Sequence, residues 1–231
     1  MQRIFDNIDQ TFLPTLRDTI NVSHKSDFCV GYFNLRGWKS ISDLIDHFSG
    51  GDEAQCRLLV GMKSLEENEL KESFKITTDD IGIDLKTANR LKKKLAHDFR
   101  NQLTYGLPNS IDEAGLRKLA KQLRNEKVTV KYFVRFKLHA KLYLCYREDP
   151  NNPRTGFVGS SNLTFAGLKK QGELNVDVVD HDATAKLENW FNDRWEDRWA
   201  LDITEELIEI LETSWASEQL VSPYHIYLKM A

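Results

Sequence analysis

The chain alternates segments with helical and strand-like hydrophobic patterns, and this alternation constrains its fold more than any other feature. Residues 8–21 place apolar side chains on one helical face, and the aromatic-rich segment 26–34 has the pattern of a strand. A second helical pattern at 38–48 leads to a buried-strand pattern at 55–61. A strand, a helix and a strand in succession form a βαβ unit, which favours a parallel or mixed sheet. The sequence therefore predicts an α/β fold with a mixed β-sheet flanked by helices on both faces.

The remainder of the chain adds strands to this sheet and helices around it. A pair of basic helical stretches over about 84–125 indicates a helical insertion that lies on or near the sheet rather than a separate domain. We expect one domain over residues 1–231. The further strands are expected at 128–135, 138–146, 155–159 and 173–179, and the C-terminal helices at about 182–200 and 204–216.

The composition excludes several classes of protein. There is no run of about eighteen apolar residues, so we expect no transmembrane helix and no membrane partner. The N-terminal residues contain no apolar signal region, so we expect no secretion. Cys29, Cys56 and Cys145 lie scattered in strand-like segments without a Cys-x-x-Cys pair. We therefore expect buried free thiols, no zinc site and a cytoplasmic location.

Charge is divided along the chain, although the formal net charge is only −3. Residues 86–141 contain fifteen Lys and Arg against four Asp and Glu, whereas residues 180–218 contain twelve acidic residues against three basic ones. Such a division can present one face to a polyanion. It is equally expected if two solvated helix faces pack against each other, so charge alone does not decide between these interpretations.

The segment FKLHAKLYLCY, residues 136–146, combines an apolar strand pattern with a histidine and a lysine. Side chains alternate across a strand, so the aliphatic residues share one face and the imidazole and ammonium share the other. A lone H-x-K pair is usually an ordinary surface pair, and its meaning depends on what surrounds it. The two expected faces are Leu138, Ala140, Leu142 and Leu144 on the core side, and His139, Lys141, Tyr143 and Cys145 on the site side.

A second polar cluster follows the next predicted strand. Residues 159–162, Gly-Ser-Ser-Asn, form a turn rich in hydroxyl and amide groups, and one helical turn over 163–167 ends at a glycine. Such a turn can offer side-chain and backbone donors to a phosphate. Glu173 stands at the start of the following strand and is the type of group that can orient an imidazole.

The order H-x-K, then G-S-x-N, then a glutamate before an apolar strand resembles the active-site motif of the phospholipase D superfamily. The resemblance runs from His139 to Glu173 and extends more loosely over the whole α/β pattern. It implies a phospholipase D-like fold. The sequences YFNLRGW, GSSNLTFAGL and SPYHIYLKMA also resemble the phospholipase-D-like domain at the N-terminus of bacterial helicase-type and restriction-type proteins. This implies a fragment of a longer chain, with a helicase or ATPase module C-terminal to it.

The resemblance implies a role for each motif residue. His139 would be the nucleophile and would form a phosphohistidine intermediate, and Lys141 would stabilise charge on the phosphoryl oxygens. Ser160 and Asn162 would complete the phosphate-binding pocket, and Glu173 would accept a hydrogen bond from the imidazole of His139. The reaction would need neither a metal nor another cofactor.

Two departures from the family pattern matter. The pattern often continues H-x-K-x4-D, and Tyr146 occupies the aspartate position here. The family reaction also uses two histidines, one as nucleophile and one as general acid, whereas this chain has a single H-x-K. The resemblance therefore implies a homodimer in which two copies of His139 meet across a two-fold axis.

The basic segment before the site favours nucleic acid as the partner. The sequence therefore predicts a metal-independent phosphodiesterase, a nuclease domain acting on DNA, with Lys92, Lys93 and Lys94 as nucleic-acid contacts. Two alternatives stay open: a DNA-binding and dimerisation module that does little chemistry, and a phosphodiesterase of lipids or small molecules.

Overall fold

A single mixed sheet forms the centre of the molecule in the computed structural model, which describes residues 3–61, 85–103 and 110–212. The strand order is β1-β7-β6-β5-β2-β3-β4-β8. β2, β3 and β4 are parallel and all other neighbouring pairs are antiparallel, which confirms the predicted mixed sheet. The strands are β1 (Ile4–Phe5), β2 (Lys25–Val30), β3 (Cys56–Val60), β4 (Val128–Phe133), β5 (Leu142–Tyr146), β6 (Arg154–Gly159), β7 (Asn175–Val178) and β8 (Ala200–Asp202).

The pairing brings one set of strand ends together. The carboxyl ends of β2, β3, β4 and β6 lie at the same edge of the sheet as the amino ends of β5 and β7. We call this edge the carboxyl edge. It holds the residues that follow β2, β3, β4 and β6 and those that precede β5 and β7. In open α/β sheets, ligands characteristically bind outside the carboxyl ends of the strands.

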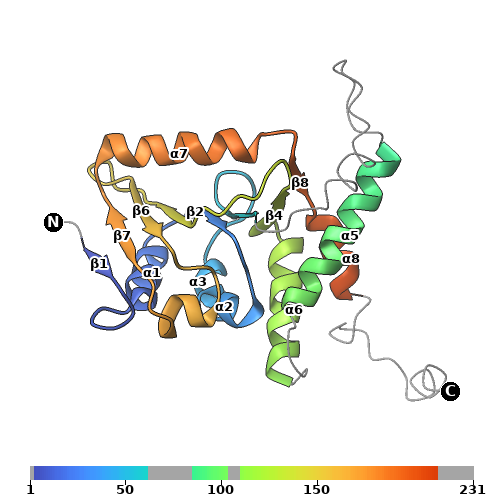
Figure 1. The fold of residues 1–231 in the computed structure, drawn as a ribbon, viewed down its shortest axis with the longest axis horizontal. Coiled ribbons are helices and arrows are strands. Elements are labelled where there is room, and N and C mark those ends of the chain that lie inside the picture. Colours follow the sequence, from blue (N-terminus) through green and yellow to red (C-terminus); the bar gives the residue numbers. More distant parts are fainter. Residues whose placement is uncertain (1–2, 62–84, 104–109, 213–231) are drawn as a thin grey trace.

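Helices cover both faces of the sheet, as predicted (Figure 1). The helix α7 lies alone above the sheet in Figure 1, and the other helices lie on the opposite side or beside β4. None of the helices in the described ranges is long and apolar enough to cross a membrane. The helices are α1 (Phe12–Asn21), α2 (Leu35–Lys39), α3 (Ser42–Ile45), α5 (Leu85–Leu103), α6 (Ser110–Arg124), α7 (His181–Trp195) and α8 (Thr204–Glu212), with one further short helix, η1 (Ala166–Lys170).

The basic helical insertion packs against the acidic C-terminal helix. Both α5 and α6 contact α8, and α6 and α8 contact β4. Lys93 on α5 lies 3.6 Å from the carboxylate of Glu209, and Arg124 at the end of α6 pairs with Glu212. Part of the charge division along the sequence is therefore satisfied within the fold, because oppositely charged helix faces meet.

The strand β5 is buried on both of its faces. Leu142 and Leu144 belong to the apolar cluster beneath α7, as the predicted alternation requires. Tyr143 and Cys145 belong instead to the larger core around α1, where Tyr143 packs against Phe12. The expectation that this second face lines a polar site is therefore wrong for Tyr143 and Cys145. The three cysteines are buried and free, and burial raises the pKa of the Cys29 thiol to about 12.

Several predicted boundaries differ from the observed ones. The strand predicted at 138–146 begins only at Leu142, and the one predicted at 173–179 begins at Asn175. The helix predicted at 38–48 is two short helices, and the first starts at Leu35 because Asn34 caps it by accepting the N–H of Gly37. The chain leaves α7 after Trp195 and forms β8, which was not predicted. Residues 213–216 of the last predicted helix lie outside the described residues.

Candidate active site

His139 and Lys141 lie in the connection from β4 to β5, at the carboxyl edge, and not on a strand. Main-chain hydrogen bonds fix this connection on both sides of the histidine. The Leu138 N–H donates to the carbonyl of Gly61 at 2.9 Å, and the Gly159 N–H donates to the carbonyl of Lys141 at 3.3 Å. A Cβ on Gly61 would come within 2.4 Å of the Leu138 Cβ, so this approach requires glycine.

The ammonium group of Lys141 faces the imidazole of His139. Its Nζ lies 3.0 Å from Nδ1 and 2.9 Å from Nε2, and it also donates to the His139 carbonyl at 3.0 Å. An ammonium can only donate, so the ring nitrogen that accepts from it carries no proton. The structure brings these two predicted site residues together.

Burial distinguishes the two side chains. His139 is exposed, whereas only 5% of the Lys141 surface is accessible. Desolvation lowers the pKa of Lys141, and the nearby negative charge of Glu173 partly opposes this by favouring the ammonium. In this arrangement the exposed imidazole can contact a substrate, and the ammonium of Lys141 beside it can stabilise negative charge on the oxygens of that substrate.

The turn over Gly159–Asn162 is held tightly by residues beneath it. Ser161 is buried, its Oγ donates to the Gly167 carbonyl at 2.8 Å, and it accepts from Asn175 Nδ2 at 2.7 Å. The Tyr143 hydroxyl donates to the Ser161 carbonyl at 3.0 Å. A Cβ on Gly159 would lie 2.1 Å from the Leu174 carbonyl oxygen, so the turn can close against β7 only with glycine there.

Asn162 joins this turn to the loop after β2. Its Oδ1 accepts the N–H groups of Gly31 at 3.1 Å and Tyr32 at 2.9 Å. These two bonds fix the orientation of the amide and leave its Nδ2 as the donor group for a ligand. The predicted phosphate-binding residue is therefore also a structural link between two loops of the carboxyl edge.

Glu173 lies just before β7 and pairs with Ser160. The Ser160 hydroxyl donates to Glu173 Oε2, and the same oxygen of Ser160 accepts the Leu174 N–H at 2.9 Å. Among the described residues, the hydrogen bonds of Glu173 include none to His139, whose ring faces Lys141 instead. Glu173 acts on the site through its charge, which favours the ammonium form of Lys141.

The position of the missing aspartate is occupied by a buried hydrogen-bond network. The hydroxyl of Tyr146 donates to Asp27 on the neighbouring strand β2. The Arg57 guanidinium on β3 binds the same carboxylate through Nε at 2.6 Å and Nη2 at 2.7 Å. Asn192 of α7 accepts from Arg57 at 2.8 Å. A carboxylate is thus present in this region, supplied by another strand.

Sequence reasoning missed the residues that support the site from beneath. Asn175 and Tyr143 fix the Ser161 backbone, and Gly61 supports Leu138. A buried asparagine in a strand was the available signal for Asn175, because a buried amide needs partners. No local pattern identifies Gly61, since its partner is far away in sequence. Lys92, Lys93 and Lys94 lie on α5, which is not one of the segments that carry the motif residues.

Comparison with known families and structures supports the resemblance seen in the motifs. The family model described as cardiolipin synthase, PLD-like domain, matches residues 16–195. A comparison with curated protein sequences finds no significant match.

Three solved structures resemble the fold at low sequence identity. Nuc from Salmonella typhimurium, a phospholipase D family member, is 11% identical, with a TM-score of 0.48 over 87% of this chain and 97% of that chain. NucT from Helicobacter pylori is 9% identical, with a TM-score of 0.50 over 87% of this chain and 98% of its own. TrmBL2, an archaeal chromatin protein, is 15% identical, with a TM-score of 0.42 over 84% of this chain and 52% of its own.

The family model covers well over half of the chain and includes every motif residue of the carboxyl edge. The fold of the chain is similar to that of NucT from Helicobacter pylori. The chain therefore belongs to the phospholipase D-like family.

Proposed function

We propose that this chain is a metal-independent nuclease domain that cleaves DNA through a phosphohistidine intermediate. Its family makes it a phosphodiesterase by class, and the proposal concerns its substrate and mechanism. The observation that supports it most is the contact between His139 and Lys141. An exposed imidazole lies 2.9 Å from a nearly buried ammonium, at the edge where Ser160 and Asn162 are also positioned.

The first step would transfer the phosphoryl group to the histidine. A ring nitrogen of His139 attacks phosphorus, the N–P bond forms, and the bond from phosphorus to the leaving oxygen breaks. Lys141 would stabilise the charge on the non-bridging oxygens, with the Asn162 amide and the Ser160 hydroxyl as further donors. The leaving oxygen takes a proton from a general acid. Water then attacks phosphorus, the N–P bond breaks and the free imidazole is restored.

The general acid would come from a second copy of the chain. The sequence has one H-x-K, and none of its other histidines has a lysine two residues later. We therefore propose a homodimer in which His139 of each copy serves the same phosphodiester. Light scattering across a dilution series tests this, with specific activity expected to fall together with the dimer fraction. A monomer that keeps full specific activity would contradict the shared site.

The predicted contacts with nucleic acid outside the site stay part of the proposal. Lys92, Lys93 and Lys94 lie on α5, and Lys93 also pairs with Glu209 at 3.6 Å between two exposed side chains. An exposed ion pair of this kind contributes little to stability, so Lys93 can bind a phosphate in place of Glu209. Reversing the three charges should weaken DNA binding at low salt. If the affinity for DNA is unchanged, α5 is not part of the DNA-binding surface. A helicase or ATPase module C-terminal to the chain is proposed on the resemblance alone.

Cleavage of DNA in EDTA tests the central proposal. The parent, His139→Ala and His181→Ala are incubated with labelled DNA and excess EDTA. His181 is an exposed histidine at the start of α7, so its substitution is a matched control. We expect cleavage by the parent and by His181→Ala only. Mass spectrometry of the acid-sensitive adduct in a rapidly quenched reaction should locate phosphorus on His139.

The other outcomes distinguish the alternative functions. Salt-sensitive DNA binding without cleavage by the parent would identify a binding and dimerisation module. Turnover of a phospholipid headgroup, with no action on DNA, would identify a lipid phosphodiesterase. Cleavage that His139→Ala retains would show that another residue is the nucleophile.

A further inference from the structure

Two aromatic side chains stand exposed at the carboxyl edge. Among the large apolar side chains that are strongly exposed in the described residues, only Tyr32 and Phe136 are aromatic. Tyr32 is 47% exposed and Phe136 is 52% exposed. Tyr32 follows β2, and Phe136 lies between β4 and β5. Both side chains are therefore partly exposed near the motif residues, where they can contact a ligand that has an apolar face.

Tyr32 is attached directly to the predicted phosphate pocket. Its N–H donates to Asn162 Oδ1 at 2.9 Å, and the preceding N–H of Gly31 donates to the same oxygen. The next residue, Phe33, is buried and packs on Phe99 of α5 with ring centroids 5.1 Å apart. The Tyr32 backbone is therefore fixed on both sides, which keeps its ring near Asn162 at little cost in conformational entropy.

Phe136 is attached to the other side of the site. It precedes His139 by three residues, so their Cα atoms are separated by at most about 11 Å. Its ring packs edge-on against Phe133, with centroids 4.9 Å apart, and Phe133 is buried beneath α7. One edge of the Phe136 ring is thus supported while about half of the side chain stays in solvent.

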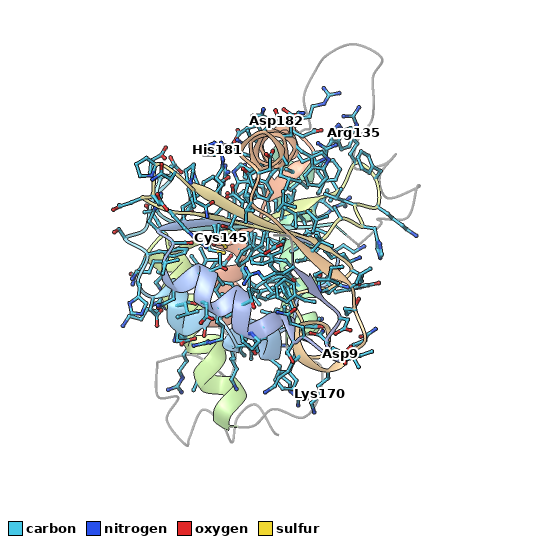
Figure 2. The ribbon with its side chains drawn as sticks, turned by 90° about the vertical axis from the view of Figure 1, so that its left-hand side faces the viewer. Asp9, Arg135, Cys145, Lys170, His181 and Asp182 are labelled. Atoms are coloured by element: carbon cyan, nitrogen blue, oxygen red, sulfur yellow. The ribbon has the colours of Figure 1, made fainter. Side chains whose placement is uncertain are left out.

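Exposed basic side chains lie on the segments next to these rings and to Asn162. Lys137 is exposed next to Phe136, and Lys169 and Lys170 are exposed on η1, which follows the turn containing Asn162. Figure 2 shows Arg135 above the sheet and Lys170 below it. Cations interleaved with exposed aromatic rings are the composition of surfaces that bind single-stranded nucleic acid, where bases stack and phosphates meet charge.

We propose that Tyr32 and Phe136 are stacking platforms for unpaired bases on the two sides of the phosphate held at His139 and Lys141. In a duplex the base faces are already stacked on one another, so the rings can engage only a single strand, a loop or a frayed end. The substrate class is therefore single-stranded nucleic acid. This inference rests on the proposed nuclease function for its catalytic meaning, but the stacking itself is a binding property.

Binding measurements test the stacking without any cleavage. Each variant is made in the His139→Ala background and titrated against a fluorescein-labelled 20-nucleotide single strand and the matching duplex by anisotropy. Tyr32→Ala and Phe136→Ala should each weaken single-strand binding about tenfold, because the loss of one stacked base lowers the affinity by about this factor. Duplex binding should change less than about twofold. Tyr32→Phe and Phe136→Tyr should retain single-strand affinity.

Val22→Ala is the control, since Val22 is exposed at the end of α1, before the amino end of β2 and thus at the opposite edge of the sheet. Equal losses for single strand and duplex, or no loss for either, would overturn the inference. So would a fall in molar mass by light scattering in Tyr32→Ala or Phe136→Ala, which would assign the rings to contacts between two copies. Hydrolysis of bis(4-nitrophenyl) phosphate by chains with an intact His139 tests the phosphodiesterase chemistry separately.

Discussion

The hydroxyl of Tyr146 donates a hydrogen bond to the buried carboxylate of Asp27 on the adjacent strand. Tyr146 stands where the H-x-K-x4-D pattern has its aspartate, so the acidic group of this region comes from β2 instead of β5. Arg57 pairs with the same carboxylate and closes the network. The departure from the family pattern is thus structural: a carboxylate, a guanidinium and a phenol replace a single acid.

Tyr146→Asp should destabilise the protein even though it restores the family residue. The substitution would bury a second carboxylate beside Asp27 and remove an apolar ring, and we expect a loss of about 3 kcal/mol in the free energy of unfolding. Because the new carboxyl group would have a raised pKa in the folded state, the loss should shrink as pH falls. Urea denaturation at two pH values measures this, with Tyr146→Phe as the milder comparison. If Tyr146→Asp is as stable as the parent, the Tyr146–Asp27–Arg57 network does not contribute to stability.

Lys141 should determine the alkaline limit of activity. Burial lowers its pKa, so the ammonium is lost at a lower pH than an ordinary lysine would lose it. At a pH between the lowered pKa of the folded state and the ordinary pKa of lysine, the unfolded chain binds more protons than the folded chain. The free energy of unfolding therefore rises with pH in that window. Lys141→Arg should move the alkaline limb of kcat/KM to higher pH, and Lys141→Ala should reduce kcat by about 100-fold or more. If the alkaline limb of kcat/KM does not move in Lys141→Arg, the limb is due to the titration of another group.

Glu173→Gln separates the charge of Glu173 from its hydrogen bond. An amide oxygen can still accept from Ser160, so the turn should keep its shape. Loss of the negative charge removes the effect that favours the ammonium of Lys141, so the alkaline limb should move to lower pH. Ser160→Ala is the converse control, because it keeps the charge and removes the hydroxyl. An unchanged limb in Glu173→Gln would show that its charge does not act on Lys141.

Gly159→Ala should abolish activity while the matched substitution Gly172→Ala should not. A Cβ at Gly159 would lie 2.1 Å from the Leu174 carbonyl oxygen, whereas one at Gly172 would meet only the Ile8 side chain at 3.9 Å. The turn that holds Ser160 and Asn162 must therefore move in the first variant. Activity in EDTA and thermal unfolding measure both effects. An active Gly159→Ala variant would mean that the turn can shift without losing the site.

The sequence predicted the architecture of the sheet, but it did not predict which backbone groups hold the motif residues in place. Hydrophobic periodicity was sufficient for the mixed sheet because it is a local property. The placement of His139 on a strand was wrong because the segment takes its hydrogen bonds from Gly61 and Gly159, which are distant in sequence. The Asn162 bonds to Gly31 and Tyr32 were unpredictable for the same reason. The aromatic rings Tyr32 and Phe136 gave no signal until their exposure was known.

The main-chain bond between Leu138 and Gly61 has a consequence for how this site can diversify. The backbone around the histidine is held by main-chain hydrogen bonds and by a glycine that excludes a side chain, so the position of this backbone depends little on the side chains of the carboxyl edge. Those side chains can then be replaced over evolutionary time without moving the backbone of His139. A chain built in this way can acquire new substrates by exchanging the residues around a fixed imidazole.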